Sequence, residues 1–124
     1  MIGATLPMAG RFARAAEGAG ANPLTIWVRI AADESVTLIV PASEMGQGIQ
    51  TSMPMLLAEE LEVDWANVRA EFAPANAAYT NPIFHMQGTG GSTSIRAFFN
   101  PLRQAGAAAR EMLIQAAANE WGVP

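Results

Sequence analysis

The spacing of hydrophobic residues constrains this fold most, because its period changes sharply along the chain. Residues 26–30 and 36–40 alternate apolar with other side chains around a polar turn, which predicts a β-hairpin with one buried face. In residues 49–61 the apolar side chains recur three and four positions apart, as in an amphipathic helix. The first half of the chain is therefore predicted to form two strands and then a helix.

The start of that helix has two alternatives in the sequence. Ser52 could cap it, which would put Pro54 in the first turn, where a missing N–H costs little. A start near Gly48 would instead place Pro54 inside the helix as a kink. Both alternatives leave the glycine-rich residues 44–48 between the strand and the helix.

The second half of the chain is predicted to add a third strand and a long helix. Residues 68–74 alternate as a strand does. Residues 75–91 have no periodicity, and a loop of that length in a small domain is usually functional or disordered. A helical stripe follows, formed by Ile95, Phe98, Phe99, Leu102, Ala109, Met112, Leu113 and Ala116. It keeps its phase across Pro101, which favours one kinked helix, or two helices in near-continuation.

These segments predict an α+β fold in one domain, which we expect to cover residues 22–124. The 124 residues, 51% of them hydrophobic, suffice for one core. Residues 1–21 are small and weakly apolar, and Ala13-Arg14-Ala15 resembles the end of a secretory signal. Because the basic region of a signal is missing, we expect either a signal remnant or a flexible N-terminal tail.

The composition excludes several classes of function. Seven basic residues, all of them arginine, stand against eleven acidic ones, so a net charge of −4 provides no basic face for nucleic acid. The lack of lysine removes Schiff-base chemistry and the P-loop lysine. The lack of cysteine removes thiolate zinc sites and iron–sulfur ligation by this chain. No apolar run reaches the roughly 20 residues of a membrane span.

Two glycine-rich loops precede helices and are the candidate binding segments. Glycines let the backbone approach a ligand closely, and the N–H groups at a helix start attract anions. The candidate residues of the first loop are Gly46, Gln47 and Gly48, whose glutamine amide both donates and accepts hydrogen bonds. The alternative for this loop is an ordinary turn from strand to helix.

The second loop, residues 87–94, has consecutive glycines followed by hydroxyl residues. Such glycines permit a nest of N–H groups, and the hydroxyls could bind phosphate oxygens or cap the next helix. Arg96 lies within reach of the helix start. The candidate residues are Gly91, Ser92, Thr93 and Ser94. A flexible loop with a serine cap is the alternative, although two such loops in one small domain favour a phosphorylated ligand.

Other polar and aromatic residues are weaker candidates for function. His85 is the only histidine and cannot complete a metal site within this chain. Glu44 could act as a general base, but no second carboxylate has a spacing that would pair with it. Trp27, Trp65 and Trp121 are scattered, which favours packing roles. We assign no catalytic residue and no direct metal ligand to this chain.

The two loops resemble segments of the xanthine oxidase and aldehyde oxidase family of molybdenum hydroxylases. Residues 43–51, Ser-Glu-Met-Gly-Gln-Gly-Ile-Gln-Thr, are similar to the turn that lies against molybdopterin, and residues 87–94 to the segment that holds the pterin and its phosphate. The isoquinoline 1-oxidoreductase-like branch, which includes membrane-bound aldehyde dehydrogenases of bacteria, has further patterns in the same order. They are Trp27-Val28-Arg29-Ile30, Ala58-Glu59-Glu60-Leu61, Pro101-Leu102-Arg103 and Trp121-Gly122-Val123-Pro124.

The resemblance implies part of a molybdenum-cofactor-binding domain in an oxidoreductase that hydroxylates aldehydes or N-heterocycles with oxygen from water. It implies Gln47 near the metal, and Gly46, Gly48 and residues 91–94 on the pterin and phosphate of molybdopterin cytosine dinucleotide. It also implies 2Fe-2S clusters on a small partner subunit and a cytochrome c as electron acceptor. The expected location is the periplasm or the periplasmic face of the inner membrane, with the cytoplasm as the alternative.

The chain departs from that family in extent. The family subunit is several times longer, and its catalytic glutamate lies in a downstream region that is absent here. We therefore expect an N-terminal fragment that is inactive alone. Two other functions stay open: a phosphate- or nucleotide-binding module without redox chemistry, and a structural interaction domain.

Overall fold

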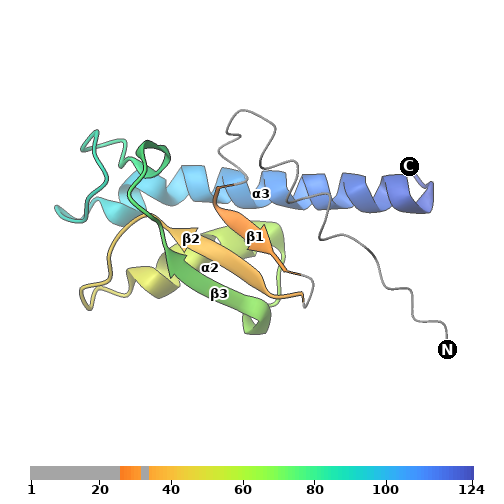
Figure 1. Ribbon diagram of the computed structural model, residues 1–124, viewed down its shortest axis with the longest axis horizontal. Helices are drawn as coiled ribbons and strands as arrows, with labels where there is room; N and C mark the ends of the chain where they lie inside the picture. The colour runs from red at the N-terminus through yellow and green to blue at the C-terminus, as the bar shows by residue number, and fades with distance from the viewer. Residues whose placement is uncertain (1–25, 32–33) are drawn as a thin grey trace.

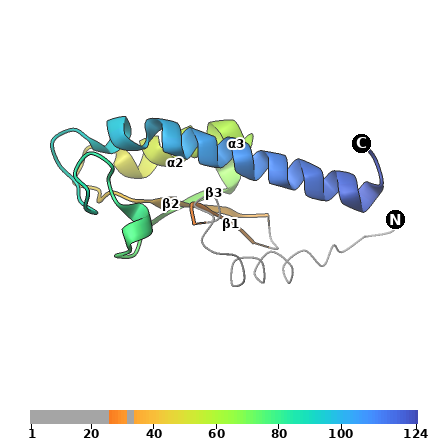
Figure 2. The ribbon, with the colours of Figure 1, turned by 90° about the horizontal axis from the view of Figure 1, so that it is seen from above.

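The computed structural model describes residues 26–31 and 34–124. In this part of the chain, a three-stranded sheet forms one layer and two helices form the other (Figure 2). The expectations for residues 1–21, as a signal remnant or a flexible tail, lie outside the described residues. None of the described helices is both long and apolar enough to cross a membrane.

The predicted hairpin is present as strands β1 (Val28–Ile30) and β2 (Val36–Val40), which pair antiparallel. Strand β3 (Val68–Phe72) pairs with the other edge of β2, so β2 is the central strand. A central strand has a neighbouring strand on each edge, so its side chains are often deeply buried. In β2, Leu38 and Val40 are at most 1% exposed. The sheet core is therefore built on β2.

Strands β2 and β3 run parallel, and helix α2 (Ile49–Leu61) connects them. Parallel neighbouring strands need a crossover connection, usually a helix, because a tight turn would make the second strand antiparallel to the first. The carboxyl ends of β2 and β3 consequently lie at the same end of the sheet. The α+β prediction is confirmed, and the parallel pairing adds a strand–helix–strand unit to it.

Helix α2 begins at Ile49 with Gly48 as its N-cap residue, so the start near Gly48 is confirmed and the Ser52 cap is wrong. The hydroxyl of Ser52 instead donates to the carbonyl of Gly48 at 2.9 Å. Pro54 lies inside the helix and is fully buried. Its burial in the core offsets the backbone hydrogen bond that proline cannot donate.

Helix α3 (Ser94–Trp121) is one continuous element of 28 residues with Pro101 inside it, as the unbroken stripe predicted. It lies beside α2 on the same face of the sheet, and its second half runs past the strands (Figure 1). Phe98 and Leu102 of the stripe are buried, whereas Phe99 is 41% and Met112 45% exposed. The stripe was thus predicted too wide, and the Arg103 guanidinium covers the Phe99 ring at 5.4 Å.

The tryptophans divide between core and surface. Trp27 is buried and meets the rings of Tyr79 and Phe98 edge to face, with centroids 5.2 and 5.9 Å apart. Trp65, in a 3-10 turn (η1, Trp65–Asn67) before β3, is 47% exposed, and Trp121 is 71% exposed. The predicted packing role is therefore confirmed for Trp27 and wrong for the other two.

A glycine sets the close approach of α2 and α3. A Cβ atom on Gly106 would lie 2.4 Å from the carbonyl oxygen of Leu57 and 3.0 Å from the Cβ atom of Glu60. Glu60 also forms an ion pair with Arg103 on the exposed side of this crossing. Exposed pairs of this kind contribute at most about 1 kcal/mol, so the packing at Gly106 dominates the contact.

Replacing Gly106 with alanine is expected to lower the free energy of unfolding by about 1–3 kcal/mol, as overpacked cores do. Alanine is the better helix former by about 1 kcal/mol, so any net loss must come from the clash with α2. Urea unfolding of Gly106→Ala should be compared with Gln104→Ala, an exposed site of the same helix. Equal or higher stability of Gly106→Ala would show that the helices separate at little cost.

Candidate functional site

Both glycine-rich loops lie at one end of the molecule (Figures 1 and 2). The glutamine turn, residues 43–48, leads from β2 into α2, and the hydroxyl loop, residues 87–93, leads into α3. This end therefore combines the carboxyl ends of two parallel strands with the starts of two helices. Ligands of α/β sheets commonly bind at such an edge, and helix starts favour anions.

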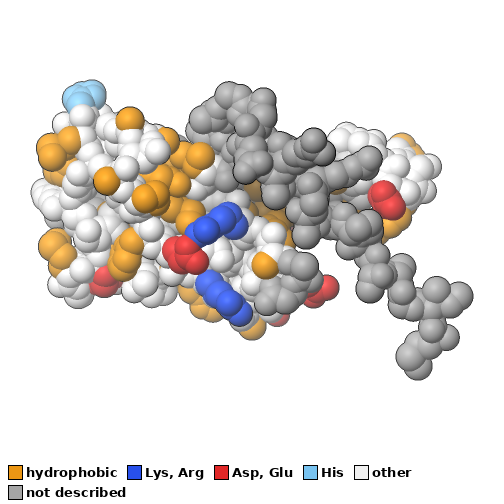
Figure 3. Space-filling model, viewed as in Figure 1, with side chains coloured by type: hydrophobic (Ala, Val, Ile, Leu, Met, Phe, Trp, Pro, Cys, Tyr) orange, Lys and Arg blue, Asp and Glu red, His pale blue; other side chains and the backbone are white. Residues whose placement is uncertain are grey.

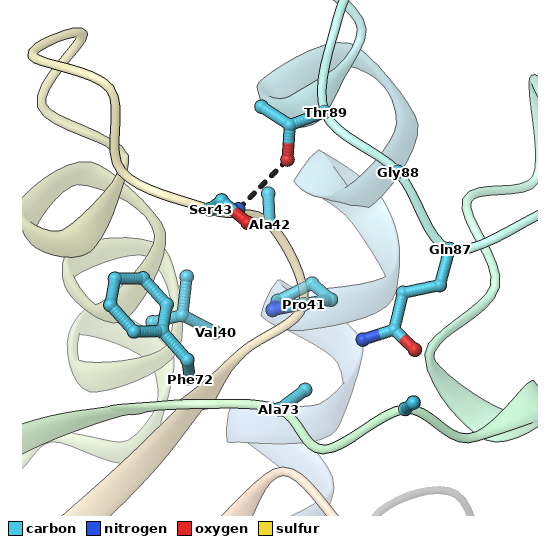
Figure 4. A pocket seen from close by; sticks show the side chains of 10 residues that line it. Val40, Pro41, Ala42, Ser43, Phe72, Ala73, Gln87, Gly88 and Thr89 are labelled. Atoms are coloured by element: carbon cyan, nitrogen blue, oxygen red, sulfur yellow. Dashed lines mark hydrogen bonds between the residues drawn. The ribbon is translucent and has the colours of Figure 1, made fainter.

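The two loops are joined by a hydrogen bond beside a cavity. The N–H of Ser43 donates to the hydroxyl of Thr89 at 2.8 Å, as Figure 4 shows. The cavity has a volume of about 370 Å³. Its walls come from the ends of β2 and β3 and from the hydroxyl loop, and they comprise Val40, Pro41, Ala42, Ser43, Phe72, Ala73, Ala75, Gln87, Gly88 and Thr89. The hollow thus lies at the bases of the two loops, and none of the candidate residues at positions 46–48 and 91–94 lines it.

The carboxylate of Glu44 occupies the start of helix α2. One oxygen accepts hydrogen bonds from the N–H groups of Gly46 at 2.7 Å and Gly48 at 3.0 Å, and the other accepts from Gln50 at 3.0 Å. Hydrogen bonds from Gln50 and Gly48, in that order, are the main cause of a lowered pKa of Glu44. The lowered pKa argues against the general base considered for this residue, because such a base needs a pKa near neutrality.

The side chain of Gln47 is fixed by its own turn. Its oxygen accepts from the N–H of Met45 at 2.5 Å, and its nitrogen donates to the carbonyl of Ser43 at 2.7 Å. An amide has two donor hydrogens and two acceptor lone pairs, so one of each is left for a ligand. Gly46 and Gly48 on either side are exposed and have φ of +94° and +80°, which glycine adopts without strain.

The hydroxyl loop presents some of its candidate residues and buries others. Gly91 and Ser92 are exposed and have φ of +55° and +52°. Thr93 and Ser94 are buried, and the Thr93 hydroxyl donates to the carbonyl of Gly90 at 2.9 Å. No side chain caps α3 at its N-cap residue Thr93, so the serine cap, which was the alternative for this loop, is wrong. The hydroxyl of Thr93 is therefore used inside the loop.

The stretch predicted to be irregular, residues 75–91, is ordered by two side-chain amides. Asn81 is 1% exposed; its oxygen accepts from the N–H of Ile83 at 2.9 Å, and its nitrogen donates to the Thr93 hydroxyl at 3.1 Å. Gln87 accepts from the Asn76 N–H and donates to the Pro74 carbonyl. A 3-10 turn (η2, Ala77–Tyr79) also lies in this stretch. No sequence pattern indicated that these amides would hold the loop through hydrogen bonds to its backbone.

A protruding turn of residues 81–86 stands beside the hydroxyl loop. Asn81 and Met86 form an antiparallel bridge at its base. The Phe84 ring lies 3.5 Å from the position that a Cβ atom on Gly91 would occupy. His85 lies exposed in this turn. In the described ranges no group of three or more His, Cys, Asp and Glu side chains could hold a metal ion.

Charge at the loop end comes from few side chains. The basic side chains visible in Figure 3 lie over the middle of the molecule rather than over the loop end. Arg96 is exposed on the first turn of α3 and forms no ion pair with other described residues. The start of α3 thus keeps its positive character, whereas that of α2 is neutralised by Glu44.

Comparison with known proteins gives one family match and two curated relatives. The model of the molybdopterin cofactor-binding domain matches residues 3–124. The isoquinoline 1-oxidoreductase subunit beta of Brevundimonas diminuta is 40% identical over 125 residues, covering 99% of this chain and 16% of that protein. The membrane-bound aldehyde dehydrogenase (pyrroloquinoline-quinone) of Gluconacetobacter polyoxogenes is 37% identical over 109 residues, covering 88% and 14%. The chain therefore spans less than a fifth of the length of either relative.

Acid pH is expected to loosen the glutamine turn. Because the pKa of Glu44 is lowered from its ordinary 4.5 in the folded chain, its hydrogen bonds contribute stability that is fully present above 4.5. That stability is lost as the pH falls through the lower pKa of the folded state. In an NMR titration, the amide protons of Gly46, Gly48 and Gln50 should move together with a midpoint below 4.5, and Glu44→Gln should abolish the transition. A midpoint at or above 4.5 would contradict the hydrogen-bonded carboxylate.

Proposed function

Because this chain belongs to the molybdopterin cofactor-binding domain family, we propose that its two glycine-rich loops hold a molybdopterin cofactor. One observation carries the proposal: the Gln47 turn and the Gly91–Ser92 bend lie at the same end of the molecule, joined by the hydrogen bond from Ser43 to Thr89. Residues that are far apart in sequence thus form one continuous binding edge.

The hydrogen-bonding groups of this edge suit a phosphorylated pterin. The edge of a pterin ring carries both donors and acceptors, and the Gln47 amide keeps one of each after its bonds within the turn. The start of α3 has no side-chain cap and offers backbone N–H groups to a phosphate. Arg96 on the same turn adds a positive charge.

We assign the neutral and the anionic parts of the ligand to different loops. Glu44 already neutralises the start of α2, so Gly46, Gln47 and Gly48 contact the pterin near the metal. The phosphate side belongs to the start of α3. The residues that we assign to it are Gly91, Ser92, Thr93 and Ser94. Because the N–H and the hydroxyl of Thr93 both donate to the carbonyl of Gly90, Thr93 supports the loop and leaves the donors to its neighbours.

We further propose that the complete subunit is a molybdenum-dependent oxidoreductase that hydroxylates aldehydes or N-heterocycles with oxygen from water. The relatives are named as an isoquinoline oxidoreductase and an aldehyde dehydrogenase, which supports both substrate classes. The bound cofactor supplies the redox chemistry, and the residues described here bind and orient it. No described residue is assigned as the catalytic base, so this segment alone is inactive.

The finer assignments follow from the same family. We propose the cytosine dinucleotide form of molybdopterin, 2Fe-2S clusters on a small partner subunit and a cytochrome c as electron acceptor. The beta designation of one relative supports a second subunit, and the absence of cysteine requires that the clusters lie outside this segment. We place the enzyme in the periplasm or at the periplasmic face of the inner membrane, in line with the membrane-bound relative.

A second candidate ligand is pyrroloquinoline quinone, because the name of one relative contains it. This quinone carries carboxylates, which the start of α3 would also attract. Mass spectrometry of the compound released from the purified subunit, together with its metal content, separates the two. Molybdopterin with molybdenum supports the first proposal, and the quinone without molybdenum supports the second.

Gln47→Ala in the complete subunit is expected to lower bound molybdenum and turnover several-fold. The substitution removes hydrogen bonds of about 1 kcal/mol each, both to the ligand and within the turn. Gln50→Ala is the matched control, because Gln50 is exposed nearby and uses only its backbone N–H in the turn. If Gln47→Ala keeps full molybdenum content and full turnover, the role of Gln47 is wrong.

A further inference from the structure

The glutamine turn is held by hydrogen bonds rather than by packing. Residues 45–48 are exposed, and 69% of the Met45 surface is accessible. A Cβ atom added at Gly46 or Gly48 would meet no atom within 4 Å. Two glycines in so open a segment have many alternative conformations, which makes ordering the turn entropically costly. Its hydrogen bonds must therefore offset that cost.

Glu44 accepts more of these hydrogen bonds than any other described side chain in the turn. Its carboxylate accepts from the N–H groups of Gly46 and Gly48, the immediate neighbours of Gln47, and from Gln50 in the first turn of α2. Hydrogen bonds to a charged acceptor are roughly twice as strong as those between neutral groups. The backbone is consequently fixed on both sides of Gln47.

The orientation of the Gln47 amide depends on the same backbone. Its two hydrogen bonds, to the N–H of Met45 and the carbonyl of Ser43, exist only while the turn keeps its shape. Ser43 in turn donates to Thr89 in the hydroxyl loop at 2.8 Å. Loss of the Glu44 carboxylate would therefore free the Gln47 amide, while the ends of the turn stay attached through Ser43 and through the Gly48 carbonyl, which accepts from Ser52.

We propose that Glu44 is a positioning residue of the cofactor site, which holds the Gln47 amide in its binding orientation before the ligand arrives. This inference rests on the proposed function. A group that is oriented in advance binds more tightly, because no ordering entropy is lost on binding. Glu44 acts through Gln47 and the neighbouring N–H groups, and it needs no contact with the ligand.

The test uses the complete subunit that carries this segment, purified from a host that makes molybdopterin and from one that cannot. Hydrogen exchange of peptides covering residues 43–52 in the cofactor-free subunit measures the order of the turn. Pterin released from the other preparation measures retention of the ligand. The variants are Glu44→Ala and Glu44→Gln. Glu59→Gln is the matched control, because Glu59 is an exposed carboxylate on α2 that forms no ion pair with another described residue.

Glu44→Ala is expected to speed exchange of the turn about tenfold and to lower pterin content several-fold. Glu44→Gln keeps one acceptor oxygen and should rescue both properties in part, whereas Glu59→Gln should match the wild type. If the alanine variant does not fold, the glutamine variant provides the same comparison.

Two results would overturn the positioning role alone: exchange unchanged by the loss of the Glu44 carboxylate, or faster exchange with full pterin content. A wild-type subunit that carries no pterin when its host makes molybdopterin would overturn the proposed function, and this inference with it. The two failures are therefore distinguishable.

Discussion

The parallel pairing of β2 with β3 across helix α2 determines where every candidate residue lies. It brings the ends of both strands to one edge, from which the glutamine turn and the segment leading to the hydroxyl loop both emerge. Helix α3 packs beside α2 and runs in the same direction. Gly106 lets the two backbones approach closely. Packing in the core thus sets the distance between the loops, and the hydrogen bond from Ser43 to Thr89 joins them.

The two helix starts at this edge are chemically unequal. At α2, three backbone N–H groups already have a partner in the Glu44 carboxylate, while α3 has no side-chain cap. An arrangement of this kind leaves one helix start neutral and the other positive without any lysine. Under the proposed function, a segment with a net charge of −4 would still offer one positive position to a phosphorylated cofactor.

Periodicity in the sequence was sufficient to predict the elements, but not their relations in space. The hairpin, α2 and the continuous α3 follow from local spacing, whereas the parallel direction of β3 depends on a crossover that alternation does not encode. The need for glycine at position 106 is invisible locally, because it comes from the Leu57 carbonyl of another helix. Periodicity also does not show how far the neighbouring elements extend, so it could not predict that Phe99 and Trp121 are exposed.

The same limit applies to the site. The glycine loops and their place before helices were predicted, whereas the ligand proposed for them comes only from the family resemblance. That Glu44 would turn toward its own backbone depends on the positive φ of Gly46 and Gly48, which aligns the donors. The buried side chain of Asn81 accepts from the N–H of Ile83 and donates to the hydroxyl of Thr93 at the start of α3. No local sequence pattern indicates this link between distant residues.

The neutralised start of α2 has a consequence for how a ligand arrives. Each helix start is worth roughly half a positive charge, so the two together nearly balance the single negative charge of Glu44, and the charge of Arg96 remains on the α3 side. Beyond the screening length of about 8 Å in physiological salt, an approaching anion meets little attraction from this edge. Within that distance the attraction comes from the start of α3 and Arg96, so an anion is drawn to one side of the edge only, and rising ionic strength weakens that attraction.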